Sequence, residues 1–262
     1  MSKYLKRIKT LILFALMFTV LSTNAFAAES TNTYWEDLSE RAGIPVEDLQ
    51  NAYSTMTEEE FGATVQHCID AMDYYKSLPE TPSMYGSALS ESDWIAFKQS
   101  LVDGSVLLTT DSSTYGFEHG HASIISGAYS MELNPLSRVF YVTEHPGKNY
   151  NNKLSWRRIL HNQTTNYWRT RTNIGVLNSS SSSIMAAASA VGNSSVVLNK
   201  PYAALALKNS TSEYNCSSLV YRCYINSGLD ISKSASSIVL PIDIAQNTNL
   251  TLVYEYGNFS WR

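Results

Sequence analysis

The sequence predicts an α+β fold, and three features of the chain indicate it. Apolar residues recur at helical spacing over residues 33–78. Strand-type segments separated by Gly-, Asn- and Pro-rich turns follow from residue 105 onward. A cysteine-bearing helix over 216–227 then precedes a last strand over 250–256. Helices gathered at one end of a chain and strands at the other are typical of α+β proteins.

The first 27 residues have the composition of a signal peptide. Four basic residues lie among the first nine, and the apolar run Leu11–Leu21 is too short to span a bilayer comfortably. Ala25-Phe26-Ala27 matches the small-x-small pattern of a cleavage site. We therefore expect residues 1–27 to be removed and the protein to be secreted or held in the cell envelope, with no stable membrane span. An uncleaved N-terminal anchor is the alternative, and it also places the remainder outside the cytoplasm.

Residues 28–80 are predicted to form a small helical extension. Pro45 suits the first turn of a helix, and Thr57-Glu58-Glu59-Glu60 matches a capping box. Apolar residues follow that box at three- and four-residue spacing: Phe61, Val65, Cys68, Ile69 and Met72. Three roles fit such a unit: a prosegment covering a cleft, a cap that binds a partner, or scaffold.

Residues 81–94 are predicted to be a linker, because Pro82, Gly86 and several serines lie there. The second domain is then 95–262, opened by a short helix that ends near Leu101. Its predicted strands are 105–109, 121–126, 138–143, 167–172 and 250–256. Its predicted helices are 184–191, after a serine-rich loop, and 216–227, which Gly228 ends.

The charge balance argues against one class of partner. The formal net charge is −4 and the pI is near 5.7, whereas domains that bind nucleic acid usually carry a basic face. We therefore expect no nucleic-acid partner.

The chain has three cysteines, Cys68, Cys216 and Cys223. An odd number leaves at least one thiol unpaired within the chain. Cys216 and Cys223 lie on one predicted helix, roughly 10 Å apart along its axis, which exceeds the reach of a disulfide. A Cys68–Cys223 bridge fits an oxidising compartment, but we expect two buried, inert thiols beside one reactive thiol.

Cys216 is the first candidate for chemistry. Asn215 is a good N-cap, so Cys216 lies in the first turn of its helix, where free backbone N–H groups and the helix dipole stabilise an anion. Leu219, Val220 and Cys223 share its face, so this face should pack inward. The same N–H groups can hold the oxyanion of an attacked carbonyl. The structural alternative is a small buried hydrophobe.

His121 and Glu144 are the candidate partners of that thiol. An imidazole on the inner face of a sheet can accept the thiol proton and return it to a leaving group. A third group usually orients such an imidazole, and Glu144 ends the next predicted strand. The structural alternatives are a core histidine and a solvated carboxylate at a strand end.

A metal site is the rival interpretation of the histidines. His119 and His121 form a His-x-His pair, with His145 nearby. The chain has no His-Glu-x-x-His helix and no paired cysteine knuckle. We expect neither a metal nor another cofactor.

Three segments resemble NlpC-type papain-fold peptidases. Residues 212–220 with 228–231 resemble the Asp-Cys-Ser-Gly-Leu-Val segment and the following Gly-x-Asp-Leu of that family. Residues 120–127 resemble its His-Val-Gly-Ile-Tyr-x-Gly strand, and 141–147 resemble the strand after it. The histidine precedes the cysteine here, as in the circularly permuted, YiiX-like branch. Asn215 and Ser218 depart from the Asp and Gly that are common in the family.

The resemblance implies a permuted papain-like fold, in which an antiparallel sheet packs on the cysteine helix. It implies that Cys216 is the nucleophile, His121 the base and Glu144 the orienting group, with Tyr214 and Ser217 lining the site near the oxyanion. The implied activity is hydrolysis of amide or ester bonds through an acyl-enzyme, on a peptide- or amide-containing substrate such as peptidoglycan. A non-catalytic module that binds cell-wall glycan or peptide and an acyltransferase with the same acyl-enzyme are the alternatives.

Overall fold

The computed structural model describes residues 27–77, 89–110, 119–130, 138–144, 157–161, 167–232, 234–257, 259 and 261. The predicted signal peptide, apart from Ala27, and residues 81–88 of the predicted linker lie outside this part of the chain. Within it, no helix is both long enough and apolar enough to cross a membrane.

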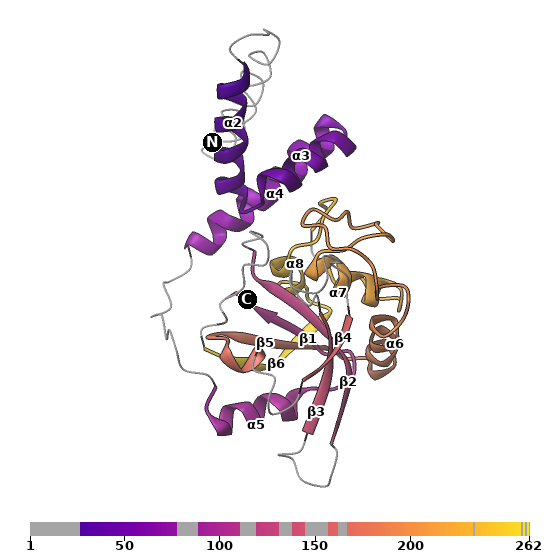
Figure 1. The fold of residues 1–262 in the computed structure, drawn as a ribbon. Helices are drawn as coiled ribbons and strands as arrows, with labels where there is room; N and C mark the ends of the chain where they lie inside the picture. Colours follow the sequence, from indigo (N-terminus) through magenta and orange to yellow (C-terminus); the bar gives the residue numbers. More distant parts are fainter. Residues whose placement is uncertain are drawn as a thin grey trace.

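A six-stranded sheet forms the centre of the fold, in the order β4-β3-β2-β1-β5-β6, and all its neighbouring strands are antiparallel (Figure 1). The strands are β1 (Val106–Thr109), β2 (His121–Ser130), β3 (Arg138–Glu144), β4 (Arg157–His161), β5 (Ile174–Ser179) and β6 (Leu250–Tyr256). The helices after the extension are α5 (Glu91–Ser100), α6 (Ser182–Gly192), α7 (Cys216–Ile225) and α8 (Pro241–Ala245). The α+β class predicted from the sequence is confirmed.

The two faces of the sheet bury different side chains. Val106, Leu108, Ala122 and Ile124 belong to a core shared with α6 and α7. Their neighbours along the strands, such as Leu107 and Ile125, belong to a second core shared with α5 and Trp168. Alternation along each strand therefore sends adjacent residues into different cores.

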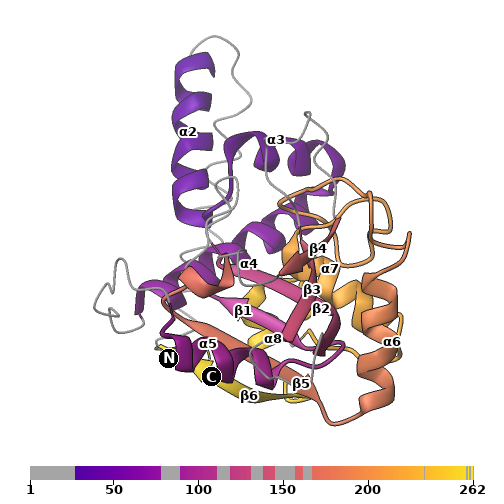
Figure 2. The same cartoon turned by 60° about the horizontal axis from the view of Figure 1, so that its bottom comes forward.

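The helical extension consists of α2 (Ala27–Ala42), α3 (Val46–Thr55) and α4 (Glu58–Ser77). In Figures 1 and 2 it lies on the side of the sheet away from α5. The predicted capping box is present: the Thr57 N–H donates to Glu60 Oε2 (2.9 Å) and the Glu60 N–H donates to Thr57 Oγ1 (3.3 Å). Phe61, Val65, Cys68 and Ile69 of α4 are buried in the core that also contains α7. The extension therefore packs on the second domain through apolar side chains.

Two predicted element boundaries were wrong, and one strand was missed. The segment 167–172 contains a 3₁₀ turn, η2 (Trp168–Thr170), and the strand comes later, at β5. Strand β4 was not predicted. The linker was predicted to reach residue 94, but α5 begins at Glu91, with Ser90 accepting from the Asp93 N–H as N-cap.

Candidate functional site around Cys216

Helix α7 begins at Cys216, as the Asn215 N-cap predicts. Asn215 Oδ1 accepts from the Ser218 N–H (2.7 Å), and Ser218 Oγ accepts in return from the Asn215 N–H (2.9 Å). The Asn215 side chain also donates from Nδ2 to the Ala204 carbonyl (2.8 Å). These three bonds fix the start of the helix and hence the position of the Cys216 backbone.

Ser217 and Tyr214 flank the cysteine but make structural contacts. Ser217 Oγ donates to the Val239 carbonyl (2.6 Å), which joins the helix start to the segment before α8. The Tyr214 hydroxyl donates to the Val196 carbonyl (3.1 Å), and this side chain is buried. The Ser217 hydroxyl is also among the groups that lower the pKa of the Cys216 thiol, whereas the site-lining role of Tyr214 stays a prediction.

The Cys216 thiol is held neutral in this conformation. The residue is 1% exposed, and burial raises the pKa of its thiol to about 11. The backbone N–H groups of Ala122, Ser217 and Cys216 itself, together with the Ser217 hydroxyl, lower the pKa and oppose that rise. The expected group of N–H donors is present around the sulfur, but the expected thiolate requires that the site become hydrated.

The His121 side chain and Cys216 lie on opposite faces of the sheet. Cys216 packs in the core of Ala122 and Ile124, while the His121 ring lies 5.7 Å from Tyr167 and 5.9 Å from Trp168 between ring centroids. Trp168 belongs to the core on the other face of the sheet. His121 Nε2 lies 3.0 Å from Ser123 Oγ on that face. The sheet therefore separates this pair, and the expectation that His121 is the base of Cys216 is wrong in this arrangement.

The third predicted residue, Glu144, is described only through its backbone, which pairs with Arg157 across β3 and β4. Its side chain lies outside the described part of the chain, and so does His145.

A different histidine, His119, lies on the cysteine's side of the sheet. Its Nε2–H donates to the Ala42 carbonyl at the end of α2 (2.7 Å), which leaves Nδ1 as the basic nitrogen. The ring is buried, and burial lowers the pKa of this imidazole to about 4. Gly120, with φ +79°, turns the chain between His119 and His121. That glycine is the one sequence signal that the two histidines need not share a face, as residues two apart in a regular strand do.

Tyr75 of α4 lies beside His119. Its hydroxyl donates to the His119 carbonyl (3.3 Å), and its ring lies 5.9 Å from the His119 ring. Burial, and then the proximity of Asp243, Cys216 and Cys68, raise the pKa of this phenol well above its usual value. No sequence pattern distinguishes Tyr75 from Tyr74 beside it, so this contact was not predicted.

His67 and Asp243 form a further contact between the extension and the second domain. His67 Nε2 on α4 lies 3.0 Å from Asp243 Oδ2 on α8. The same carboxylate oxygen accepts from the Leu240 N–H (2.8 Å) and caps α8. The pair therefore joins α4 to the start of α8, the helix that follows Val239, whose carbonyl accepts the Ser217 hydroxyl.

All three cysteines are free and buried, so the Cys68–Cys223 bridge is absent. Burial raises the thiol pKa of both Cys68 and Cys223 above that of Cys216. Among the described residues, no group of three or more His, Cys, Asp or Glu side chains is arranged to hold a metal ion.

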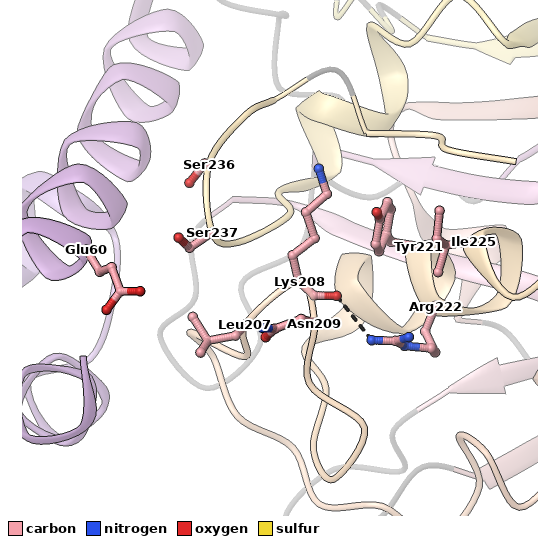
Figure 3. A pocket seen from close by; sticks show the side chains of 9 residues that line it. All are labelled: Glu60, Leu207, Lys208, Asn209, Tyr221, Arg222, Ile225, Ser236 and Ser237. Carbon is pink, nitrogen blue, oxygen red and sulfur yellow. Dashed lines mark hydrogen bonds between the residues drawn. The ribbon is translucent and has the colours of Figure 1, made fainter. Parts of the chain in front are cut away.

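A pocket with a volume of about 420 Å³ lies elsewhere, between the start of α4 and the outer face of α7 (Figure 3). Glu60 forms one wall, and Lys208, Tyr221 and Arg222 form the other. Arg222 donates to the Lys208 carbonyl (3.3 Å), as Figure 3 shows, and to that of Ser210 (2.8 Å). Neither Cys216 nor any other predicted site residue lines this pocket.

No family model, curated protein or solved structure matches the chain.

Proposed function

We propose that this protein is an extracytoplasmic cysteine hydrolase in which Cys216 is the nucleophile and His119, rather than His121, is the base. The observation that carries the proposal is the place of Cys216: the first residue of a capped helix, packed on a sheet strand, with several N–H groups around its sulfur. Such donors stabilise both a thiolate and the oxyanion of an attacked carbonyl.

His119 is favoured because its ring lies on the cysteine's side of the sheet and its tautomer leaves Nδ1 as the basic nitrogen. The Ala42 carbonyl accepts its Nε2–H and fixes the tautomer, which is the orienting role that Glu144 was expected to have. His67, in contrast, is bonded to Asp243. Tyr75 lies beside His119 and packs against the buried core that contains Cys216, so His119 and Cys216 lie on one side of the sheet.

The reaction follows from these two groups. His119 Nδ1 takes the thiol proton, and the sulfur attacks a carbonyl carbon to form the C–S bond. The tetrahedral oxyanion is held by backbone N–H groups and collapses as the C–N or C–O bond breaks, while the imidazolium protonates the leaving group. Water, deprotonated by His119, then releases the acid and regenerates the thiol.

The substrate class comes from the sequence. The basic and apolar N-terminus indicates export, and the resemblance to permuted papain-like peptidases implies a papain-like fold and peptide amides, with the cell-wall peptides of peptidoglycan as the expected substrate.

Formation of an acyl-enzyme tests the proposal directly. The purified protein is incubated with an activated ester, and the mass added to the chain is located by peptide mapping. We expect acylation at Cys216, none in Cys216→Ala, and a rate about 10²–10⁴-fold lower in His119→Gln. His121→Gln is the matched control and should acylate at nearly the wild-type rate.

Three other outcomes have defined meanings. Loss of acylation in His121→Gln alone would restore His121 as the base. Binding of cell-wall peptide without acylation would favour a binding module. Transfer of the acyl group to an amine in preference to water would make the protein an acyltransferase.

A further inference from the structure

The pocket between α4 and α7 is separate from the Cys216 site, since neither Cys216 nor His119 lines it. Its volume of about 420 Å³ lies within the range of about 300–1,000 Å³ that is typical of sites for small molecules. Figure 3 shows Glu60 of α4 on one side and Lys208 and Arg222 on the other. The pocket is therefore large enough for a small ligand and carries opposite charges on its two walls.

The basic wall of the pocket is held in place by hydrogen bonds to the backbone. Arg222 donates from Nη2 to the carbonyls of Lys208 (3.3 Å) and Ser210 (2.8 Å), which ties their loop to α7. The Lys208 N–H donates to the Ser237 carbonyl (2.6 Å), which joins that loop to the segment before α8. The two cationic side chains therefore extend from an ordered framework, and such a framework lowers the entropic cost of binding.

The cations of this wall contact neutral groups. Lys208 Nζ donates to the Ser234 carbonyl (2.9 Å) and lies 5.0 Å from the centroid of the Tyr221 ring. The Arg222 guanidinium donates to two backbone carbonyls and to Asn226 Oδ1 (3.5 Å). The ion pairs found in the described part of the chain lie elsewhere. An anion in the pocket would therefore supply a counter-ion that these residues do not supply to one another.

Glu60 carries the opposite charge on the other wall. Its Oε2 accepts from the Thr57 N–H (2.9 Å) and from the Thr57 hydroxyl (2.8 Å). These bonds, the backbone one first, lower the pKa of the Glu60 carboxyl, so it is ionised at neutral pH. Its other oxygen, Oε1, accepts no hydrogen bond from the described residues and can accept one from a cationic ligand group.

We propose that this pocket binds a short peptide with free ends, whose carboxylate lies at Lys208 beside the Arg222 charge and whose ammonium lies at Glu60. The site does not depend on the proposed hydrolase centre. A ligand with one charge of each sign satisfies both walls, whereas an anion alone would be repelled by Glu60. A free amino acid carries both charges on one carbon, but Glu60 faces the basic wall from across the pocket (Figure 3), so a dipeptide suits the two walls better.

The surface between the two walls also suits a peptide. Leu207 and Ile225 offer apolar contact to a ligand side chain. The hydroxyls of Ser236 and Ser237 and the side-chain amide of Asn209 can form hydrogen bonds with a peptide group. Apolar contacts combined with a few polar groups are typical of small-molecule sites.

Calorimetric titration of the purified protein with alanyl-leucine tests the site. Two analogues each lack one charge: N-propionyl-leucine lacks the ammonium, and alanyl-leucine amide lacks the carboxylate. At the binding efficiency usual for drug-sized ligands, the roughly 14 non-hydrogen atoms of the dipeptide give a Kd of about 1 mM or tighter. We expect each analogue to bind about three- to tenfold more weakly than the dipeptide.

Two variants remove one charge each from the protein. Glu60→Gln keeps a capping-box residue, and Lys208→Met keeps an apolar side chain of similar length. Glu60→Gln should bind alanyl-leucine about threefold more weakly but should bind N-propionyl-leucine as the wild type does, because that analogue lacks the group that Glu60 contacts. Lys208→Met should bind the dipeptide about tenfold more weakly and leave the affinity for the amide unchanged.

Glu59→Gln and Lys76→Met are the matched controls. Each removes the same charge from an exposed residue of α4 that does not line the pocket. Both should bind alanyl-leucine with the wild-type Kd. Because Glu60→Gln preserves the helix cap, it still tests the site if Lys208→Met fails to fold.

Four results would overturn the site. They are no binding of alanyl-leucine at about 10 mM, equal Kd values for the dipeptide and both analogues, equal losses of affinity in Glu60→Gln and Glu59→Gln, and binding of free leucine as tight as that of the dipeptide. None of these measurements involves an acyl-enzyme at Cys216, so the peptide site and the hydrolase fail separately.

Discussion

Replacement of Asn215 by alanine should weaken the fold at the point that positions Cys216. The change removes the N-cap acceptor of the Ser218 N–H, which typically costs about 1 kcal/mol. It also leaves the Ala204 carbonyl, on a residue that is 1% exposed, without the Nδ2–H that it accepts. An unsatisfied buried acceptor costs about 1–3 kcal/mol, so we expect a total loss of about 2–4 kcal/mol.

Urea unfolding, followed by both circular dichroism and tryptophan fluorescence, measures this loss, and coincident transitions establish two-state behaviour. At about 2–4 °C per kcal/mol for a chain of this size, the midpoint of thermal unfolding should fall as well. Asn215→Ser keeps an acceptor for the Ser218 N–H and should recover only the part of the unfolding free energy that comes from the N-cap, not the part that comes from the bond to the Ala204 carbonyl. Asn249→Ala is the control, because Asn249 makes the same kind of bond, from Nδ2 to the Asp230 carbonyl, at an exposed position. The reasoning would be refuted if Asn215→Ala cost no more than Asn249→Ala.

Three further predictions concern buried groups. Because burial lowers the pKa of His119 to about 4, the unfolded chain, with a histidine pKa of about 6.5, takes up this proton first as the pH falls. The stability that comes from keeping His119 neutral is complete above pH 6.5 and is lost as the pH falls toward 4. Between pH 7 and pH 5 the free energy of unfolding should therefore fall by about 2 kcal/mol more in the wild type than in His119→Gln, as measured by urea titrations. Gly104→Ala should cost about 2–5 kcal/mol, because φ is +84° and the added Cβ would collide with the Met185 carbonyl; an unchanged melting temperature would contradict this. Tyr224→Phe removes the donor to the Gly104 carbonyl (2.6 Å) and should cost about 1–3 kcal/mol, with no loss expected in an exposed Tyr53→Phe control.

Local signals predicted most elements correctly. The Thr57–Glu60 capping box and the Asn215 cap act within four residues, and both helices begin where these caps predict. Strands β1, β3 and β6 were recognised from short apolar runs between turns. Strand β5 was not, since Ile174–Ser179 is a brief buried run with a glycine inside it, and periodicity does not identify such runs.

The candidate site was predicted only in part. The place of Cys216 at the start of a helix, with an inward-facing apolar stripe, follows from residues within one helix, and all of Leu219, Val220 and Cys223 are buried. The contacts of Tyr75 join residues of α4 to His119 and Trp261, far apart in the sequence. No local pattern contains that information, because either of two adjacent tyrosines fits the helix equally.

The sequence by itself determined that β2 is a strand and that its residues alternate between two faces. Only the tertiary structure decided which face each histidine takes. Strand β2 is buried on both sides, so it lacks the apolar–polar alternation that marks the solvent face of a sheet. If the assignment of β2 residues to the two faces is shifted by one residue, the faces are exchanged but the sequence pattern is unchanged. In the structure, the turn at Gly120 places His119 on the side of Cys216, while His121 enters the opposite core.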